Sequence, residues 1–403
     1  MKSEKRDFKK GFIIGMLAML LLVIVASAAL FLKAYQRSGQ QKSDTVLLNE
    51  KTEEKLLGIT NIIENYYYED VDEDALVEGL YSGVVQGVSD PYSVYYTAKE
   101  YNSLMESTAG IYYGIGTQLT QNVNTMEVEI IRVFKGSPAE EAGLKAGDVI
   151  IKAGDVEAAS IELAQFVLNI KGEAGTTVHL TIYRKEETKK LEFDVTRRQV
   201  ETPTVEYQLL DGDVGLIQLT EFTQVTFEQF QNAVDDLTQQ GMKFMIVDLR
   251  NNPGGLLDSV CNILDAILPE GLLVYTEDKN GKREELASDA EHAMDTPLAV
   301  LINKNSASAS EIFAGAIKDY GYGTLIGTTS FGKGIVQKIF PLEDGSALKV
   351  TTSKYFTPKG NYIHDVGIEP DITLEYKYAN EEDTTYDPMN DNQVQKAIEV
   401  LKK

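Results

Sequence analysis

Cysteine and histidine are scarce in this chain of 403 residues, which contains one cysteine and three histidines. The lone Cys261 excludes an intramolecular disulfide framework and a cysteine-rich metal site. Because it lies in the apolar run 256–268, we expect a small core residue. The histidines, His179, His292 and His364, stand in no recognisable motif. No nucleotide-binding fingerprint is present, and we expect neither a metal nor a cofactor.

Basic residues are outnumbered by acidic ones, 38 Lys and Arg against 62 Asp and Glu, which gives a net charge of −24. Nucleic acid is therefore excluded as a partner, because binding to phosphates needs a basic surface. The hydrophobic content of 43% and the aromatic content of 9% are ordinary for globular proteins. The length leaves room for two or three domains.

Charge is absent from the 22 residues of segment 11–32, which follow a basic tail, residues 1–10, with five Lys or Arg and two acids. A run of this length can span a membrane as a helix. The charge bias predicts a single-pass cell-membrane protein with a cytoplasmic N-terminus and an extracytoplasmic main part. Ala26–Ser27–Ala28 is a plausible cleavage site, so a removed signal peptide and secretion are the alternative.

Region 43–107 has two apolar stripes at helical spacing. The first contains Leu56, Leu57, Ile59, Ile62, Ile63 and Tyr66, and the second Leu76, Val77, Leu80, Tyr81, Val84, Val85 and Val88. Such stripes must be covered, either by the chain's own domains or by a second copy. A short amphipathic helix at 394–401, within the acidic tail region 379–403, could pair with them. A homodimer through the terminal helices is one of these alternatives, and the sequence pattern alone does not choose between them.

Segment 108–197 reads as a small β-rich unit. It opens with Tyr113, Gly114, Ile115 and Gly116, and it continues with the runs 136–144 and 146–151. Alone, a Gly-x-Gly would more often be a bulge or turn than a ligand loop. Together the three runs resemble a PDZ domain. That resemblance implies that residues 113–116 form a loop whose N–H groups hold a peptide's terminal carboxylate, although such domains can also be mainly regulatory.

Segment 204–378 alternates strands with helices, which predicts an α/β core with substantial parallel pairing. The pattern gives strands at 214–219, 244–249 and 298–302, helices at 227–237, 256–268 and from about 308 to 320, and a hairpin of 335–340 with 347–355. Between strand 244–249 and the next helix, Pro253, Gly254 and Gly255 must make a tight turn. Its simplest interpretation is a strand-to-helix connection.

Ser308 lies in a serine-rich run, 305–311, just before the helix that ends near 320. Unpaired N–H groups at a helix start can stabilise an oxyanion beside a serine nucleophile. Downstream, Lys333 sits between two glycines and could act as a base if burial lowered its pKa by roughly 2–4 units. If 333–339 is extended, Gln337 shares a face with Lys333 and could orient it. Alternatively, Ser308 and Glu311 form only a capping box, and the glycine–lysine loop is a solvated turn.

The run 305–311, Lys333 at 25 residues after Ser308, and Gln337 four residues later together resemble the carboxyl-terminal processing peptidases, or tail-specific proteases. The run 248–255, the PDZ-like segment and 367–371 add to this resemblance, which covers nearly everything after residue 32. It implies a ClpP/crotonase-like α/β core with a β-rich extension in a multidomain α/β chain. It also implies a serine endopeptidase that selects protein substrates through a free C-terminus.

The resemblance assigns Ser308 as nucleophile, Lys333 as general base, Gln337 as its orienter, and the backbone N–H groups of Gly254 and Ala309 as the oxyanion hole. Ser306 and Ser310 are rival nucleophiles that only spacing disfavours. A PDZ peptide-binding scaffold with a catalytically silent core is the main alternative function. A metal-dependent or histidine-dependent hydrolase is a weaker one.

Overall fold

The computed structural model describes residues 47, 49–210, 212–289, 291, 293–379 and 386–403. The chain divides into two compact units, 1–78 and 79–403. The basic tail 1–10, segment 11–32 and residues 380–385 of the acidic tail lie outside the described residues. The finer domain boundaries expected from the sequence stay predictions.

The predicted membrane localisation is corrected by the structure. Segment 11–32 itself is not described, and among the described residues no helix combines the length and the apolar character needed to cross a bilayer. The longest described helix near the N-terminus, α2 (Glu50–Tyr66), has 17 residues and carries four glutamates and two lysines. The single-pass, extracytoplasmic assignment is therefore withdrawn.

Both N-terminal helices form where the apolar stripes predict them. Asn49 caps α2 by accepting a hydrogen bond from the Thr52 N–H, and α3 covers Glu73–Gln86. Neither helix has a buried residue, and side chains such as Leu57 and Ile62 are more than half exposed. Within 79–403, strand β1 (Val94–Tyr96) and helix α4 (Ala98–Ala109) follow α3.

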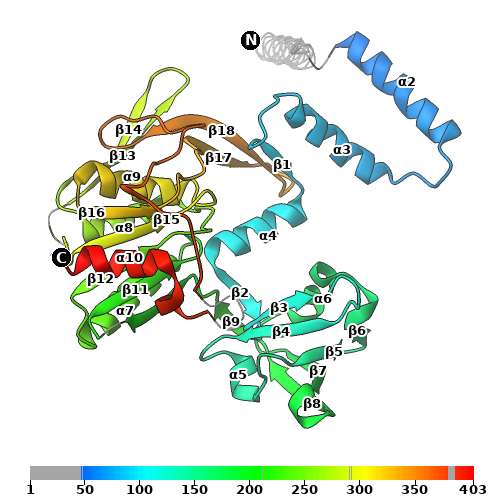
Figure 1. Cartoon of the computed structure of the whole chain (residues 1–403). Helices are drawn as coiled ribbons and strands as arrows, with labels where there is room; N and C mark the ends of the chain where they lie inside the picture. The colour runs from blue at the N-terminus through cyan, green and yellow to red at the C-terminus, as the bar shows by residue number, and fades with distance from the viewer. Residues whose placement is uncertain (1–46, 48, 211, 290, 292, 380–385) are drawn as a thin grey trace, which may run out of the picture. The chain divides into compact units, whose positions relative to one another are not determined.

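The β-rich unit forms its own core. Its elements are β2 (Ile111–Gly114), β3 (Thr117–Gln121), β4 (Val128–Val133), α5 (Pro138–Ala142), β5 (Val149–Ala153), β6 (Val156–Glu157), α6 (Leu163–Ile170), β7 (Thr177–Arg184), β8 (Lys189–Thr196) and β9 (Arg198–Glu201). The sheet order is β3-β4-β5-β7-β8, with β6 beside β5, and β2 pairs with β9 (Figure 1). Phe166, Leu180 and Ile182 lie at the centre, fully buried.

A six-stranded sheet forms the α/β core, in the order β10-β11-β12-β15-β16-β19. Its strands are β10 (Val205–Leu210), β11 (Val214–Leu219), β12 (Phe244–Asp248), β15 (Leu298–Ile302), β16 (Gly323–Gly327) and β19 (Ile372–Thr373). Only the β10–β11 pair is antiparallel, so the predicted parallel core is confirmed.

Helices cover both faces of this sheet (Figure 1). One face packs on α7 (Thr226–Gln239), α8 (Leu257–Ile267) and α9 (Ala309–Tyr320), and the other on α10 (Asn392–Leu401). Neighbouring residues of a strand point to opposite faces of the sheet. On β11, Ile217 packs on the side of α7, α8 and α9, and Leu216 packs on the side of α10. The apolar face of α10, with Val394 and Ala397, is thus buried on the core, and it is not left free to pair with the N-terminal helices.

A second sheet adjoins the core, with β1, β18 (Ala347–Phe356), β13 (Gly271–Asp278) and β14 (Arg283–Ser288) in that order and β17 (Ile335–Pro341) beside β18. The β17–β18 hairpin is the predicted one. Lys333, however, precedes β17, which begins at Ile335. The premise that 333–339 is one extended strand was therefore wrong, and strand alternation cannot place Lys333 on the same face as Gln337. The register shift at Val336 and Gln337 leaves the extra residue, Thr352, on β18.

Candidate active site

Ser308 is the N-cap of α9, directly after the loop that follows β15. Its φ of 54° and ψ of −114° lie outside the usual regions for a non-glycine residue, so the surrounding structure must hold this backbone. Its N–H donates to the Glu311 carboxylate at 2.9 Å, and its carbonyl accepts from the buried Tyr355 hydroxyl at 3.2 Å. The side chain is half-buried at the helix start.

The hydroxyls of Ser306 and Ser310 have structural partners. Both side chains are fully buried. The Ser306 hydroxyl donates to the Leu249 carbonyl at 2.8 Å, and the Ser310 hydroxyl donates to the Asn252 carbonyl at 3.0 Å. Among the three serines of the run, Ser308 alone retains partial exposure.

The 253–255 turn packs directly against Ser308. A Cβ added to Gly254, whose φ is +103°, would lie 2.8 Å from the Ser308 Cβ and 2.9 Å from the Ala309 nitrogen, so only glycine fits. Ala309 is the first helical residue, and its N–H has no partner within the helix. The Gly254 N–H donates to the Asn252 side-chain oxygen at 2.8 Å. The Gly254 and Ala309 N–H groups, which were predicted as oxyanion donors, both lie near Ser308. The Gly254 N–H is already used in the hydrogen bond to Asn252.

Glu311 connects the serine with the lysine loop. This fully buried carboxylate accepts four hydrogen bonds. One oxygen receives the Ser330 hydroxyl and the Gly332 N–H, both at 2.6 Å. The other receives the Lys333 N–H at 2.8 Å and the Ser308 N–H at 2.9 Å. From the sequence, only the capping role of Glu311 was expected. Its partners at 330–333 are distant in sequence and approach Glu311 only in the folded chain.

Lys333 is half-buried, with its Nζ 4.9 Å from the centre of the Tyr92 ring. Burial and the nearby Lys349 lower the pKa of the Lys333 ammonium below its ordinary value, and Glu311 and Asp90 oppose that shift. This is the direction that a lysine base requires. Among the described residues, no hydrogen bond joins the Lys333 Nζ to Ser308 or Gln337.

Gln337 contacts the second sheet in this structure. Its side-chain amide donates to the Thr351 hydroxyl on β18 at 3.3 Å. The sequence gave no signal for Thr351, because the pairing depends on the register of the β17–β18 hairpin.

Arg250 is a further residue that the sequence reasoning left without a role. Its guanidinium binds the Asp248 carboxylate at 2.6 Å and the Asp391 carboxylate at 2.8 Å, and it lies over the Tyr376 ring. Asp391 in turn caps α10. These ion pairs tie the turn after β12, which leads to Gly254, to the C-terminal helix.

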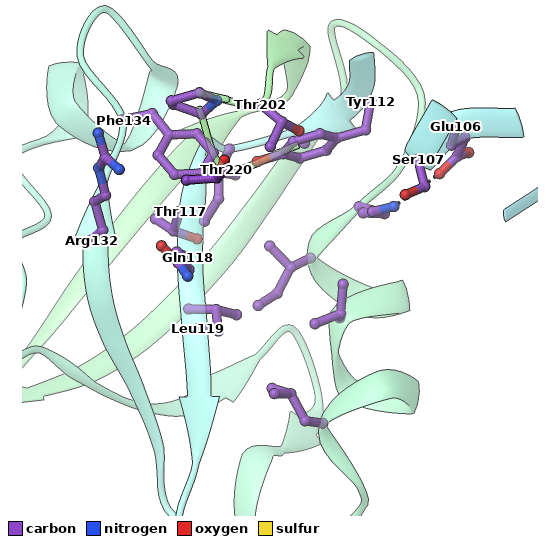
Figure 2. A pocket seen from close by; sticks show the side chains of 18 of the residues that line it. Glu106, Ser107, Tyr112, Thr117, Gln118, Leu119, Arg132, Phe134, Thr202 and Thr220 are labelled. Atoms are coloured by element: carbon purple, nitrogen blue, oxygen red, sulfur yellow. Dashed lines mark hydrogen bonds and ion pairs between the residues drawn. The ribbon is translucent and has the colours of Figure 1, made fainter. Parts of the chain in front are cut away.

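A second site is the cavity of about 570 Å³ beside the 113–116 loop. Apolar side chains of β3 and α6 line it, together with Gly114, Ile115 and Gly116. Figure 2 shows Tyr112 and Phe134 near the loop and Leu119 farther along β3. The predicted Tyr113 is absent from the lining and is half-exposed, whereas Tyr112 points into the cavity.

Five polar side chains at this cavity, Tyr112, Lys171, Glu106, Arg132 and Glu206, are already engaged. The Tyr112 hydroxyl interacts with the backbone N–H groups of Gly116 and Thr117, and burial raises its pKa to about 12. Lys171 pairs with Glu106 at 2.8 Å, and Arg132 pairs with Glu206. A peptide carboxylate at the loop would therefore have to displace the Tyr112 hydroxyl.

The histidines do not gather at either site. His179 pairs with Asp194 across β7 and β8 at 2.8 Å, and Asp194 raises the pKa of that exposed ring. His364 accepts the Gly334 N–H at 3.4 Å, close to the lysine loop. His292 lies outside the described residues. In the described part of the chain, no group of three or more His, Cys, Asp and Glu could hold a metal ion.

Three protein-family models match parts of the chain. Residues 213–374 match the model of peptidase family S41, residues 113–195 that of the PDZ domain, and residues 12–100 that of the activating protease CtpB N-terminal domain. The carboxy-terminal processing protease CtpA of Bacillus subtilis (strain 168) is 34% identical over 373 residues, which cover 92% of this chain and 78% of the relative. The chain belongs to peptidase family S41.

Two further similarities support this placement. A Staphylococcus aureus (strain MSSA476) protein named as a CtpA-like serine protease is 34% identical over 93% of this chain and 74% of its own length. The structure of a Bacteroides fragilis protein named as an S41 protease matches in fold, with a TM-score of 0.52 and 19% identity over 85% of this chain and 96% of that one. This S41 member is thus a multidomain α/β serine protease of the carboxy-terminal processing family with a PDZ domain, and its substrates are peptides or proteins.

Proposed function

We propose that this S41 protease is an endopeptidase that uses a dyad of Ser308 and Lys333. The observation that carries the proposal is the bridge through Glu311, whose one carboxylate oxygen accepts the backbone N–H groups of both residues. This shared buried anchor holds the backbones of the proposed nucleophile and base close to each other. The lowered pKa of Lys333 and the structural engagement of Ser306 and Ser310 support the same assignment.

In this mechanism the Ser308 Oγ attacks the peptide carbonyl carbon while Lys333 accepts the hydroxyl proton. The N–H groups of Gly254 and Ala309 stabilise the oxyanion, which requires Gly254 to release the Asn252 side chain. Collapse breaks the C–N bond, and Lys333 returns the proton to the leaving amine. Water then hydrolyses the acyl-enzyme ester, with Lys333 again as base. Gln337 would orient Lys333 after leaving Thr351.

The cavity at the 114–116 loop is the proposed site for a substrate's C-terminal region. Its apolar lining suits a hydrophobic C-terminal side chain, and the loop N–H groups suit the carboxylate. Access to the dyad is proposed to depend on this binding, in either an activating or an inhibitory sense.

The test is cleavage of an unfolded protein with a free C-terminus by the full chain. We expect the wild type to cut and Ser308→Ala and Lys333→Ala to be inactive, while Ser306→Ala remains active if it folds. The wild-type rate should rise with pH through a midpoint below that of a free lysine. An active Ser308→Ala variant would exclude the dyad.

A peptide-binding scaffold with a silent core is the second candidate. The engaged Gly254 N–H and the missing Ser308–Lys333 hydrogen bond favour it over a permanently aligned protease. Cleavage that stays absent even with a saturating peptide, alongside measurable peptide binding, would support this candidate. Cleavage that appears on peptide addition would support the dyad with controlled access.

We also propose a homodimer that forms through the N-terminal helices alone. The exposed apolar side chains of α2 support it, and the burial of α10 on the core removes the C-terminal helix from the interface. Sedimentation should give a dimer for the wild type and a monomer for Leu57→Glu with Ile62→Glu. A wild-type monomer at high concentration would exclude it.

A further inference from the structure

The segment Asp90–Ser93, here named the 90–93 turn, precedes β1 and is closed by its own hydrogen bonds. The Asp90 carboxylate accepts the Tyr92 N–H at 3.1 Å and the Ser93 hydroxyl at 2.6 Å. Ser93 is 9% exposed, and β1 continues from it along β18, with Val94 opposite Lys349. The turn is therefore a fixed structure at the edge of the second sheet.

This turn contacts the proposed base. The ring of Tyr92 has its centre 4.9 Å from the Lys333 Nζ, within range of a cation–π contact. No described residue accepts a hydrogen bond from that Nζ, so its close contact in the described structure is the face of the Tyr92 ring. The contact restricts where the ammonium can lie and covers one side of it from water.

The 90–93 turn is also connected, through Thr351, to Gln337, the residue proposed to orient Lys333. The Ser93 Oγ accepts the Thr351 N–H at 3.2 Å, and the Thr351 hydroxyl accepts the Gln337 amide at 3.3 Å. Two neighbouring residues of the turn thus connect to Lys333 and to Gln337.

We propose that the 90–93 turn is a positioning element for the base of the dyad, in which Tyr92 holds the Lys333 ammonium and Ser93, through Thr351, holds Gln337. This inference rests on the proposed Ser308–Lys333 dyad. The turn follows α3 closely in sequence, so only a few residues of chain separate that helix from the ring that contacts the base.

Loss of the Tyr92 ring should change the pKa of Lys333 in one direction, upward. The charged groups that face Lys333 are Lys349 on β18, Glu311 on α9 and Asp90 in the turn. Removing the Tyr92 ring leaves these charges in place and admits water, which favours the ammonium. The attraction of the ring for a cation acts in the opposite direction, but exclusion of water dominates at a half-buried site. Tyr92→Ala should therefore raise the pKa of Lys333.

The first measurement is NMR of the full chain with ¹³C-dimethylated lysines, using Lys333→Arg to assign the signal. We expect Tyr92→Ala to raise the Lys333 pKa by about one unit. Tyr92→Phe, which keeps the ring, should retain the wild-type value. Tyr95→Ala is the matched control, because Tyr95 lies on β1 but packs on Tyr81. An unchanged or lower pKa in a folded Tyr92→Ala variant overturns the proposal.

The second measurement is the pH profile of Ser308 labelling by a fluorophosphonate. Tyr92→Ala should label about tenfold more slowly at neutral pH and recover at high pH. Thr351→Val should lower kcat with little change in KM and should move the pKa less than Tyr92→Ala does. Equal profiles for all variants overturn the positioning role. If the wild type itself is never labelled, the dyad fails, and the NMR comparison still decides the role of Tyr92.

Discussion

Glu311 and Lys333 are joined by a hydrogen bond of 2.8 Å from the Lys333 backbone N–H to the buried carboxylate, across 22 positions of sequence. The same carboxylate oxygen holds the Ser308 N–H. The nucleophile and the base of the proposed dyad therefore share one anchor, and a change in that anchor moves both.

Glu311→Gln should disrupt this anchor. A glutamine offers an NH₂ group to two of the four donors, which leaves buried N–H or O–H groups unpaired and costs about 2–3 kcal/mol of unfolding free energy. Fluorophosphonate labelling of Ser308 should fall about a hundredfold, because small misplacements of reacting groups are costly. Urea unfolding and labelling rates measure both effects. Glu228→Gln, in the exposed first turn of α7, is the control, and equal labelling by both variants would contradict the anchor role.

Lys333→Met should stabilise the protein while abolishing cleavage. Because the folded pKa of Lys333 lies below its ordinary 10.5, the unfolded chain binds more protons between the two values. The wild type is therefore penalised fully at pH values below the folded pKa, and the penalty disappears as pH approaches 10.5. We expect a gain of about 1–2 °C in Tm at pH 7, small because the side chain is half-exposed. Thermal unfolding between pH 6 and 10 checks this, and a gain that grows with pH would contradict it.

The elements of the α/β core were predictable from sequence because their local patterns agree with their environments. The continuous apolar run 298–302 is a fully buried parallel strand, and the serine run ends in a helix with Ser308 as its cap. The PDZ unit followed from its glycine loops. Such features depend on residues close together in the chain.

The details of the site were not predictable for the opposite reason. The four donors of Glu311 and the contact of Tyr92 with Lys333 depend on loops that meet only in the folded chain. The start of β17 at Ile335 has no clear sequence signal, and it leaves Lys333 outside the strand on whose alternation one argument relied. The membrane assignment relied on composition in residues 11–32, and no described helix supports it.

Asp148→Asn should destabilise the PDZ unit locally. Asp148 and Arg184 form a buried bidentate pair with two contacts of 2.7 Å, and Asp148 raises the pKa of Arg184 above its ordinary value. The substitution leaves the buried Arg184 with only the more exposed carboxylate of Glu187, at 3.4 Å, and should cost about 3 kcal/mol. Hydrogen exchange should accelerate in 117–196 and not in 214–327. Glu157→Gln, which breaks the exposed pair with Lys152, should change exchange little, and equal effects of both variants would refute the distinction.

Tyr112→Phe should strengthen binding of peptides at the 114–116 loop. The phenol oxygen interacts with the Gly116 and Thr117 N–H groups. With a pKa of about 12 the phenol is neutral at pH 7. It therefore competes with a peptide carboxylate by occupying these N–H groups, and not by repelling its charge. Removing it should tighten binding of a peptide with a free C-terminus about three- to tenfold. Fluorescence anisotropy with carboxylate and amidated peptides measures this. Weaker binding by Tyr112→Phe would mean that the hydroxyl helps to hold the ligand.

The ion pair of Arg250 with Asp391 joins two segments that lie 141 positions apart in the sequence. Asp248, the other partner of Arg250, is only two positions away, so the link to Asp391 forms only after α10 has packed on the core. Until then the turn that carries Gly254 lacks its tie to α10. The turn beside Ser308 is thus completed by a long-range contact, so its geometry depends on the docking of the C-terminal helix as well as on the local sequence.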